Sequence, residues 1–119
     1  MSINESLIYK KAYSFAINII GVYKNLKEDN EYVLSKQLLR CGTSVGANIA
    51  EANGAISNPD FSAKISIAYK ETLETKYWLS LLKDTSFINE ETFQSLYNEA
   101  DEIAKILFSI LKTTRINKQ

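Results

Sequence analysis

The run QLLRCGTSVGANIAE at residues 37–51 decides the fold of this chain. It contains Gly42 and Gly46, and each glycine costs a helix about 1 kcal/mol relative to alanine. Apolar residues nevertheless recur every three or four positions straight through the run, which is the spacing of one helix face. We therefore predict a helix, with both glycines on one side, where the missing side chains let a neighbouring helix approach closely.

Two other interpretations of the glycines stay open. The first is a glycine loop that cradles phosphate, but neither GxxxxGK[ST] nor GxGxxG is present and no strand precedes the run. The second is a kink or break in the helix between Cys41 and Gly46. The unbroken apolar spacing favours a continuous helix over both.

The same spacing marks the rest of the chain. Residues 5–26, 59–84 and 90–111 show it, and the helix containing the glycines is expected to begin near Glu31. Four helices joined by short polar turns predict an all-α, up-down-up-down antiparallel four-helix bundle that forms a single domain over residues 1–119. The predicted buried rows are Ile8, Ala12, Phe15, Ile19, Val22 and Leu26; Leu34, Leu38, Cys41, Val45, Asn48 and Ala52; Phe61, Ile65, Ala68, Thr72, Thr75, Leu79 and Leu82; and Phe93, Leu96, Ala100, Ile103, Leu107, Ile110 and Leu111.

Asparagines stand where three of the helices are expected to start. Asn30, Asn58 and Asn89 are predicted N-terminal caps, because an asparagine side chain accepts a hydrogen bond from the first free backbone N–H groups. Pro59 suits a first helical position, where its missing N–H costs nothing. The basic tail from Lys112 onward is expected to fray.

The composition argues against catalysis. There is no histidine among the 119 residues, which removes the usual general base and the commonest metal ligand. The single Cys41 cannot form an intramolecular disulfide, and a reducing, cytoplasmic setting fits. No stretch is apolar enough to span a bilayer. We predict a non-enzymatic protein with no cofactor and no metal.

The first helix carries more apolar surface than a monomer needs. Its second apolar row consists of Tyr9, Tyr13, Ile17 and Ile20, and Phe108 lies off the buried row of the last helix. A large exposed apolar patch usually marks an interaction site. The surplus predicts a homo-oligomer.

Polar residues beside the buried rows are the strongest candidates for a site. Arg40 and Glu51 lie on the second helix, and Glu71 and Glu74 lie on the third. We interpret them as an arginine–glutamate network that fixes which helices pair, with Asn48 setting register in the buried row. The alternative is a carboxylate metal site of Glu51, Glu71 and Glu74, but such bundle sites also use Glu-x-x-His pairs, which this chain lacks.

Nucleic-acid binding is the second candidate function. Basic and acidic residues balance at 14 each, so no overall positive field attracts a nucleic acid. An oligomer could still align lysines on one face, as binding to a phosphate backbone requires. The candidates are Lys10, Lys11, Lys24, Lys27, Lys112, Arg115 and Lys118.

The runs QLLRCGTSVGANIAEANGA and SNPDFSAKISIAYKETLETKYWLSLL resemble a known family. They are similar to the four-helix-bundle proteins encoded in intervening sequences of bacterial 23S rRNA genes, to which the accessory variability determinants of diversity-generating retroelements are related. The resemblance covers essentially the whole chain and implies a ring-shaped homopentamer without catalytic residues. Retroelement members bind nucleic acid and a reverse transcriptase through a strongly basic surface, whereas this chain has no net charge. The recurring family residues correspond to Arg40, Asn48, Glu51, Glu71, Glu74 and Trp78.

Together these observations predict a non-enzymatic, homopentameric binding or scaffold protein whose partner is RNA, DNA or a nucleoprotein, with no membrane association. An adaptor that captures only a protein partner is the first alternative. A carboxylate-metal bundle enzyme is the second.

Overall fold

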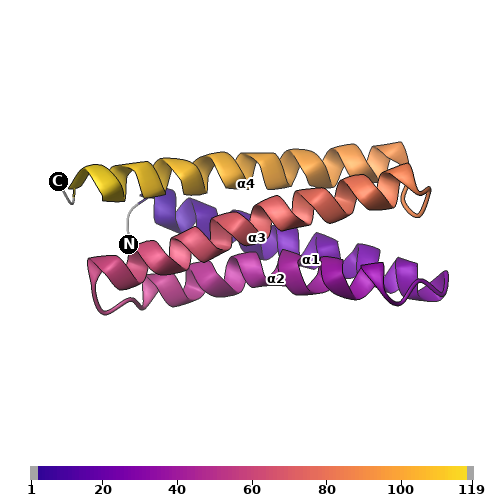
Figure 1. The fold of residues 1–119 in the computed structure, drawn as a ribbon, viewed down its shortest axis with the longest axis horizontal. Helices are drawn as coiled ribbons and strands as arrows, with labels where there is room; N and C mark the ends of the chain where they lie inside the picture. Colours follow the sequence, from indigo (N-terminus) through magenta and orange to yellow (C-terminus); the bar gives the residue numbers. More distant parts are fainter. Residues whose placement is uncertain (1–2, 118–119) are drawn as a thin grey trace.

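A computed structural model describes residues 3–117, with side chains from residue 7 to residue 114. The described part contains four helices, α1 (Ile3–Glu28), α2 (Leu34–Asn53), α3 (Asn58–Asp84) and α4 (Glu90–Asn117). Successive helices run in opposite directions, and each packs against two neighbours, so that the helices form an elongated bundle of 49 × 21 × 20 Å (Figure 1). The predicted all-α, up-down-up-down bundle is confirmed.

The core consists of one row of side chains from each helix. On α1 the buried row contains every predicted residue, from Ile8 to Leu26. The row on α3 is also as predicted from Ile65 to Leu82, with Phe61 only half-buried at its start. On α4, Ala104 joins the row and Ile110 is half-buried. The period of the apolar residues was therefore sufficient to identify most of the core.

α2 is continuous through both glycines, so the kink between Cys41 and Gly46 does not occur. Its buried row differs from the prediction at two places. Leu34 at its start is half-buried, whereas the neighbouring Ser35 is buried. Ile49, only 1% exposed, occupies the position that was assigned to Asn48. Asn48 is half-buried and bonds within α2 instead, donating to the Ser44 backbone oxygen at 2.9 Å and to its hydroxyl at 3.0 Å. Asn48 is therefore not the polar residue of the buried row.

The two glycines of α2 face α1 but differ in how closely α1 approaches them. A Cβ atom on Gly42 would lie 2.8 Å from Cγ2 of Ile19, which is closer than real Cβ contacts. A Cβ atom on Gly46 would meet nothing nearer than Ala12, at 3.7 Å. Only Gly42 stands where the absence of a side chain is required.

The turns at one end of the bundle explain why Asn30 does not cap α2. Asn30 has a φ of 63°, and the backbone N–H groups of Asn30 and Glu31 donate back to the carbonyls of Lys27 and Leu26. This is the left-handed ending typical of helix C-termini, so Asn30 closes α1. The side chain of Glu31 caps α2, because its carboxylate accepts from the N–H groups of Leu34 at 3.0 Å and Ser35 at 2.7 Å.

The other predicted caps have mixed outcomes. Ser57 rather than Asn58 caps α3, since its hydroxyl accepts from the Asp60 N–H at 3.1 Å. Asn89 does cap α4, accepting from the Thr92 N–H at 2.7 Å. α4 continues to Asn117, so the part of the basic tail that the structure describes is helical.

Candidate functional site

Arg40, Glu71 and Glu74 meet between α2 and α3, as the helix pairing predicted. One Arg40 guanidinium nitrogen donates to Glu74 Oε2 at 2.5 Å, and the other lies 3.7 Å from Glu71 Oε2. The Trp78 indole N–H donates to the same Glu74 oxygen at 3.1 Å. The Arg40 side chain is 55% exposed, so this is a network at the rim of the helix pair rather than inside the core.

Glu51 does not belong to this network. Its carboxylate forms an ion pair with Lys64 of α3 at 3.1 Å, nearer to the turn that joins α2 and α3. In residues 3–117 no group of three or more histidine, cysteine, aspartate or glutamate side chains is arranged to hold a metal ion. The metal alternative required Glu51, Glu71 and Glu74 to converge, and they do not.

Cys41 of α2 is fully buried, close to the Arg40, Glu71 and Glu74 network. Burial raises the pKa of its thiol to about 11, with the nearby Glu74 and Glu71 carboxylates acting in the same direction. The thiol is therefore protonated at neutral pH, and a protonated thiol is a poor nucleophile. Cys41 is therefore not an activated nucleophile in this arrangement.

The lysines selected from the sequence that the structure describes lie at the two ends of α1 and on α4. Lys10 and Lys11 lie near the start of α1, whereas Lys24 and Lys27 lie near its far end, about 20 Å away along the helix. Lys11 is paired with Glu102 of α4, and Lys27 covers the ring of Tyr23. Lys112 is exposed on α4, the side chain of Arg115 is not described, and Lys118 lies outside the described residues. The described lysines at the two ends of α1 therefore do not form a single patch on one protomer.

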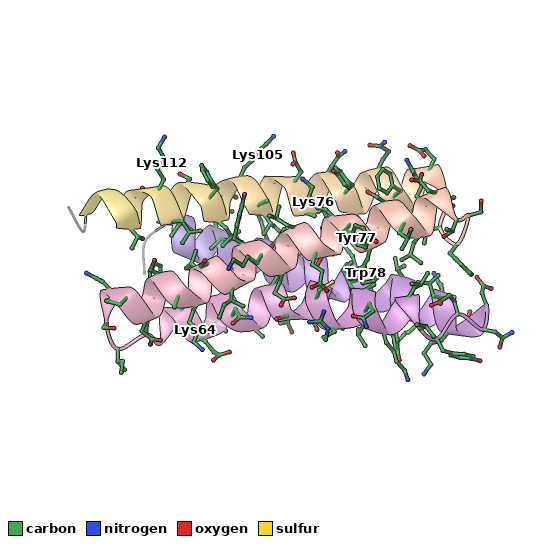
Figure 2. All side chains as sticks on the ribbon, in the orientation of Figure 1. Lys64, Lys76, Tyr77, Trp78, Lys105 and Lys112 are labelled. Atoms are coloured by element: carbon green, nitrogen blue, oxygen red, sulfur yellow. The ribbon has the colours of Figure 1, made fainter. Side chains whose placement is uncertain are left out.

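A different cluster of cations and rings lies where α3 and α4 face solvent together. Lys76 of α3 and Lys105 of α4 pair with the same carboxylate, Asp101, at 2.9 and 3.1 Å. The two lysines lower the pKa of Asp101, and the hydrogen bond to Asp101 raises that of Lys76. Lys105 and Lys112 project from the outer side of α4 (Figure 2).

Aromatic and aliphatic side chains accompany these lysines. The rings of Tyr69 and Phe108 touch across the two helices, with centroids 5.9 Å apart, and Tyr77 is 59% exposed. We call this surface the α3–α4 face; its members are Tyr69, Lys70, Leu73, Lys76, Tyr77, Asp101, Lys105, Phe108 and Lys112. Phe108 and Lys112 stood out in the sequence but the surface as a whole did not, although Tyr69, Leu73 and Tyr77 stand four residues apart on one side of a helix.

The second apolar row of α1 is exposed, as predicted. Tyr13 and Ile17 are 60% and 57% exposed, and Tyr9 and Ile20 continue the row on either side. We call these four residues the α1 row. Since the bundle core is complete without them, they form an apolar surface that the protomer itself does not cover.

A cleft of about 350 Å³ opens at the end of the bundle where α1 finishes and α4 begins. Its lining includes Glu28, Asp29 and Phe87, and none of the candidate site residues belongs to it.

None of the helices in the described part is long and apolar enough to cross a membrane.

The geometry defines a class of protein. It is an antiparallel four-helix bundle with an exposed apolar row on α1 and ion pairs between neighbouring helices at the surface. A family model described as 23S rRNA-intervening sequence protein matches residues 4–109. The chain therefore belongs to the 23S rRNA-intervening sequence protein family, which confirms the resemblance seen in its sequence.

A solved structure supports the same assignment. It is a crystal structure from Bacteroides thetaiotaomicron VPI-5482, described as a protein with unknown function from the S23 ribosomal protein family. The two chains are 47% identical, superpose with a TM-score of 0.90, and match over 92% of this chain and 99% of that one. No curated protein gives a significant match. Neither matching description names a catalytic activity, a ligand or an oligomeric state.

Proposed function

We propose that this protein is a non-enzymatic, homo-oligomeric scaffold that binds nucleic acid. The observation that carries the proposal is the α1 row, in which Tyr13 and Ile17 are more than half exposed although the core is complete. Exposed apolar rows of this kind are costly in water and are typically covered by a partner. A second copy of the chain is the partner that is always available, and the family resemblance implies a ring of five.

The neighbouring surface of α2 supports a helix-packing partner. Gly46 lies beside the α1–α2 contact, and Ala47 and Ala50 are exposed on α2. Small residues let another helix approach closely, while the α1 row supplies the apolar area. A copy of the chain that packs a helix against this surface would remove the exposed rings from water.

Nucleic acid is the proposed ligand because cationic side chains gather locally although the chain is neutral overall. Lys76 and Lys105 share one carboxylate, and Lys70 and Lys112 make no ion pair with a described side chain. An oligomer repeats such a cluster on every protomer and thereby builds a larger positive surface. For binding through phosphate contacts, the logarithm of the association constant is expected to fall linearly with the logarithm of the salt concentration.

Light scattering coupled to gel filtration tests the oligomer. Five copies of 13.5 kDa give about 68 kDa, and a mass of 13.5 kDa at micromolar concentration would contradict the proposal. Fluorescence anisotropy with labelled RNA tests the ligand separately. An oligomer that binds no nucleic acid even at low salt would leave the protein-adaptor function as the better account.

A further inference from the structure

The α3–α4 face combines exposed rings with an excess of positive charge. Tyr77 and Phe108 are 59% and 50% exposed, and Leu73 lies one helical turn before Tyr77. Among the members of the face, four lysines stand against the single carboxylate of Asp101, a local charge of +3. Aromatic rings set among lysines are the features with which proteins bind single-stranded nucleic acid, because every base has a face that stacks.

The rings and the cations are close enough to act on one strand. Lys105, Phe108 and Lys112 follow one another at steps of three and four on α4, so they lie on one side of that helix. Tyr69 reaches Phe108 across the helix pair, and Lys76 reaches Asp101, which fixes α3 and α4 in register. Tyr77 and Phe108 are thus two stacking positions, with Lys105 and Lys112 beside them.

The other exposed row has a different character. The α1 row contains two tyrosines and two isoleucines and no charge, which suits contact with a second copy of the chain. Lysine is depleted at the centres of protein–protein interfaces. A face that carries four lysines around its rings is therefore better matched to a polyanion than to another protein.

We propose that single-stranded nucleic acid binds along the α3–α4 face, with bases stacked on Tyr77 and Phe108 and phosphates held by Lys105 and Lys112. This inference rests on the nucleic-acid part of the proposed function and gives it a site. Of the cations that the sequence suggested it keeps Lys112, and it uses Lys105 in place of the lysines of α1.

The test is fluorescence anisotropy with a short labelled oligouridylate at low salt, using the full-length protein. Tyr77→Leu keeps an apolar side chain but removes the ring, and we expect it to weaken binding between about fivefold and a hundredfold. Tyr77→Phe keeps the ring and is expected to bind like the unmodified protein. Equal weakening by both substitutions would contradict stacking.

The cations are tested with a matched pair of double variants. Lys105→Gln with Lys112→Gln is expected to weaken binding and to flatten the salt dependence by roughly one unit of slope per lysine. Lys10→Gln with Lys24→Gln removes the same charge from exposed positions on α1 and is expected to change binding little. The helical circular dichroism and the oligomeric mass should be unchanged in every variant.

The outcomes separate the two proposals. If the oligonucleotide binds but only the α1 double variant weakens it, the α3–α4 face is the wrong site and the nucleic-acid function stands. If the unmodified protein binds none at low salt, the function and its site are both overturned. Equally tight binding of a blunt duplex, unaffected by Tyr77→Leu, would also overturn the stacking role.

Discussion

At the scale of single residues, Gly42 and Gly46 look alike in the sequence but differ in the structure. A methyl group on Gly42 would press on Ile19, which is fully buried and branched at Cβ, so it has little freedom to turn away. Overpacking of a core typically costs 1–3 kcal/mol. A methyl group on Gly46 would enter ordinary contact with Ala12. The spacing identified both glycines, but only the register of α1 against α2 distinguishes them.

We therefore predict opposite effects of two identical substitutions. Gly42→Ala should lower the free energy of unfolding by up to about 2 kcal/mol, after allowing for the better helix propensity of alanine. Gly46→Ala should raise it by up to about 1 kcal/mol, because only the propensity term remains. Urea denaturation followed by circular dichroism measures both. Equal destabilisation by the two substitutions would show that α1 approaches both glycines closely.

The Arg40 network is another residue-scale feature whose strength depends on burial. From the sequence alone, an arginine between two glutamates is compatible with a buried ion pair, and breaking such a pair costs about 3–5 kcal/mol. The structure leaves Arg40 55% exposed. Exposed ion pairs contribute about 0–1 kcal/mol, so the network specifies the pairing of α2 with α3 more than it stabilises the fold.

At the scale of helices, most of the interior was predictable, whereas the caps were predictable only in part. Buried rows follow from the period of the apolar residues, which is a property of the sequence itself. The difference between Asn48 and Ile49 is one residue, or about 100° around α2, and both fit a spacing of three or four. Caps depend on the backbone conformation of the turn, and Asn30 can either begin a helix or close the preceding one.

The start of α2 provides a prediction about pH. Although burial opposes it, the hydrogen bonds from the Leu34 and Ser35 N–H groups hold the pKa of Glu31 below its ordinary value of 4.5. A lowered pKa means that the ionised cap stabilises the folded state fully above about pH 5, and that this contribution is lost as the pH falls through the folded-state pKa. The cap therefore weakens in acid.

Glu31→Ala should lower the free energy of unfolding by about 1 kcal/mol near neutral pH, the usual value of a helix cap. The difference from the unmodified protein should shrink as the pH falls through the folded-state pKa of Glu31, because the carboxyl group is then protonated in both states. Glu28→Ala is the matched control, since Glu28 is exposed in the same turn region and makes no ion pair with a described side chain. A difference that persists undiminished in acid would contradict a charged cap.

At the scale of the whole molecule, the candidate surfaces arise from pairs of helices. The α1 row was visible in the sequence because all four residues belong to one helix. The α3–α4 face was missed because Tyr77 and Phe108 are far apart in the chain, and only the antiparallel register of α3 and α4 places their neighbours together. Periodicity within a helix says nothing about that register.

The exposed α1 row leads us to expect that the stability of the protein depends on its concentration. If the α1 row is covered by a second copy, unfolding is linked to dissociation, and the thermal midpoint must rise with protein concentration. We expect a hundredfold increase in concentration to raise the midpoint by roughly 5–10 °C. Ile17→Glu places a charge in the row and should abolish this dependence, because a buried unpaired charge prevents association. Ile56→Glu alters an isoleucine that is 94% exposed in the α2–α3 turn, and it should leave the dependence intact. A midpoint that is independent of concentration in the unmodified protein would mean that the row faces water.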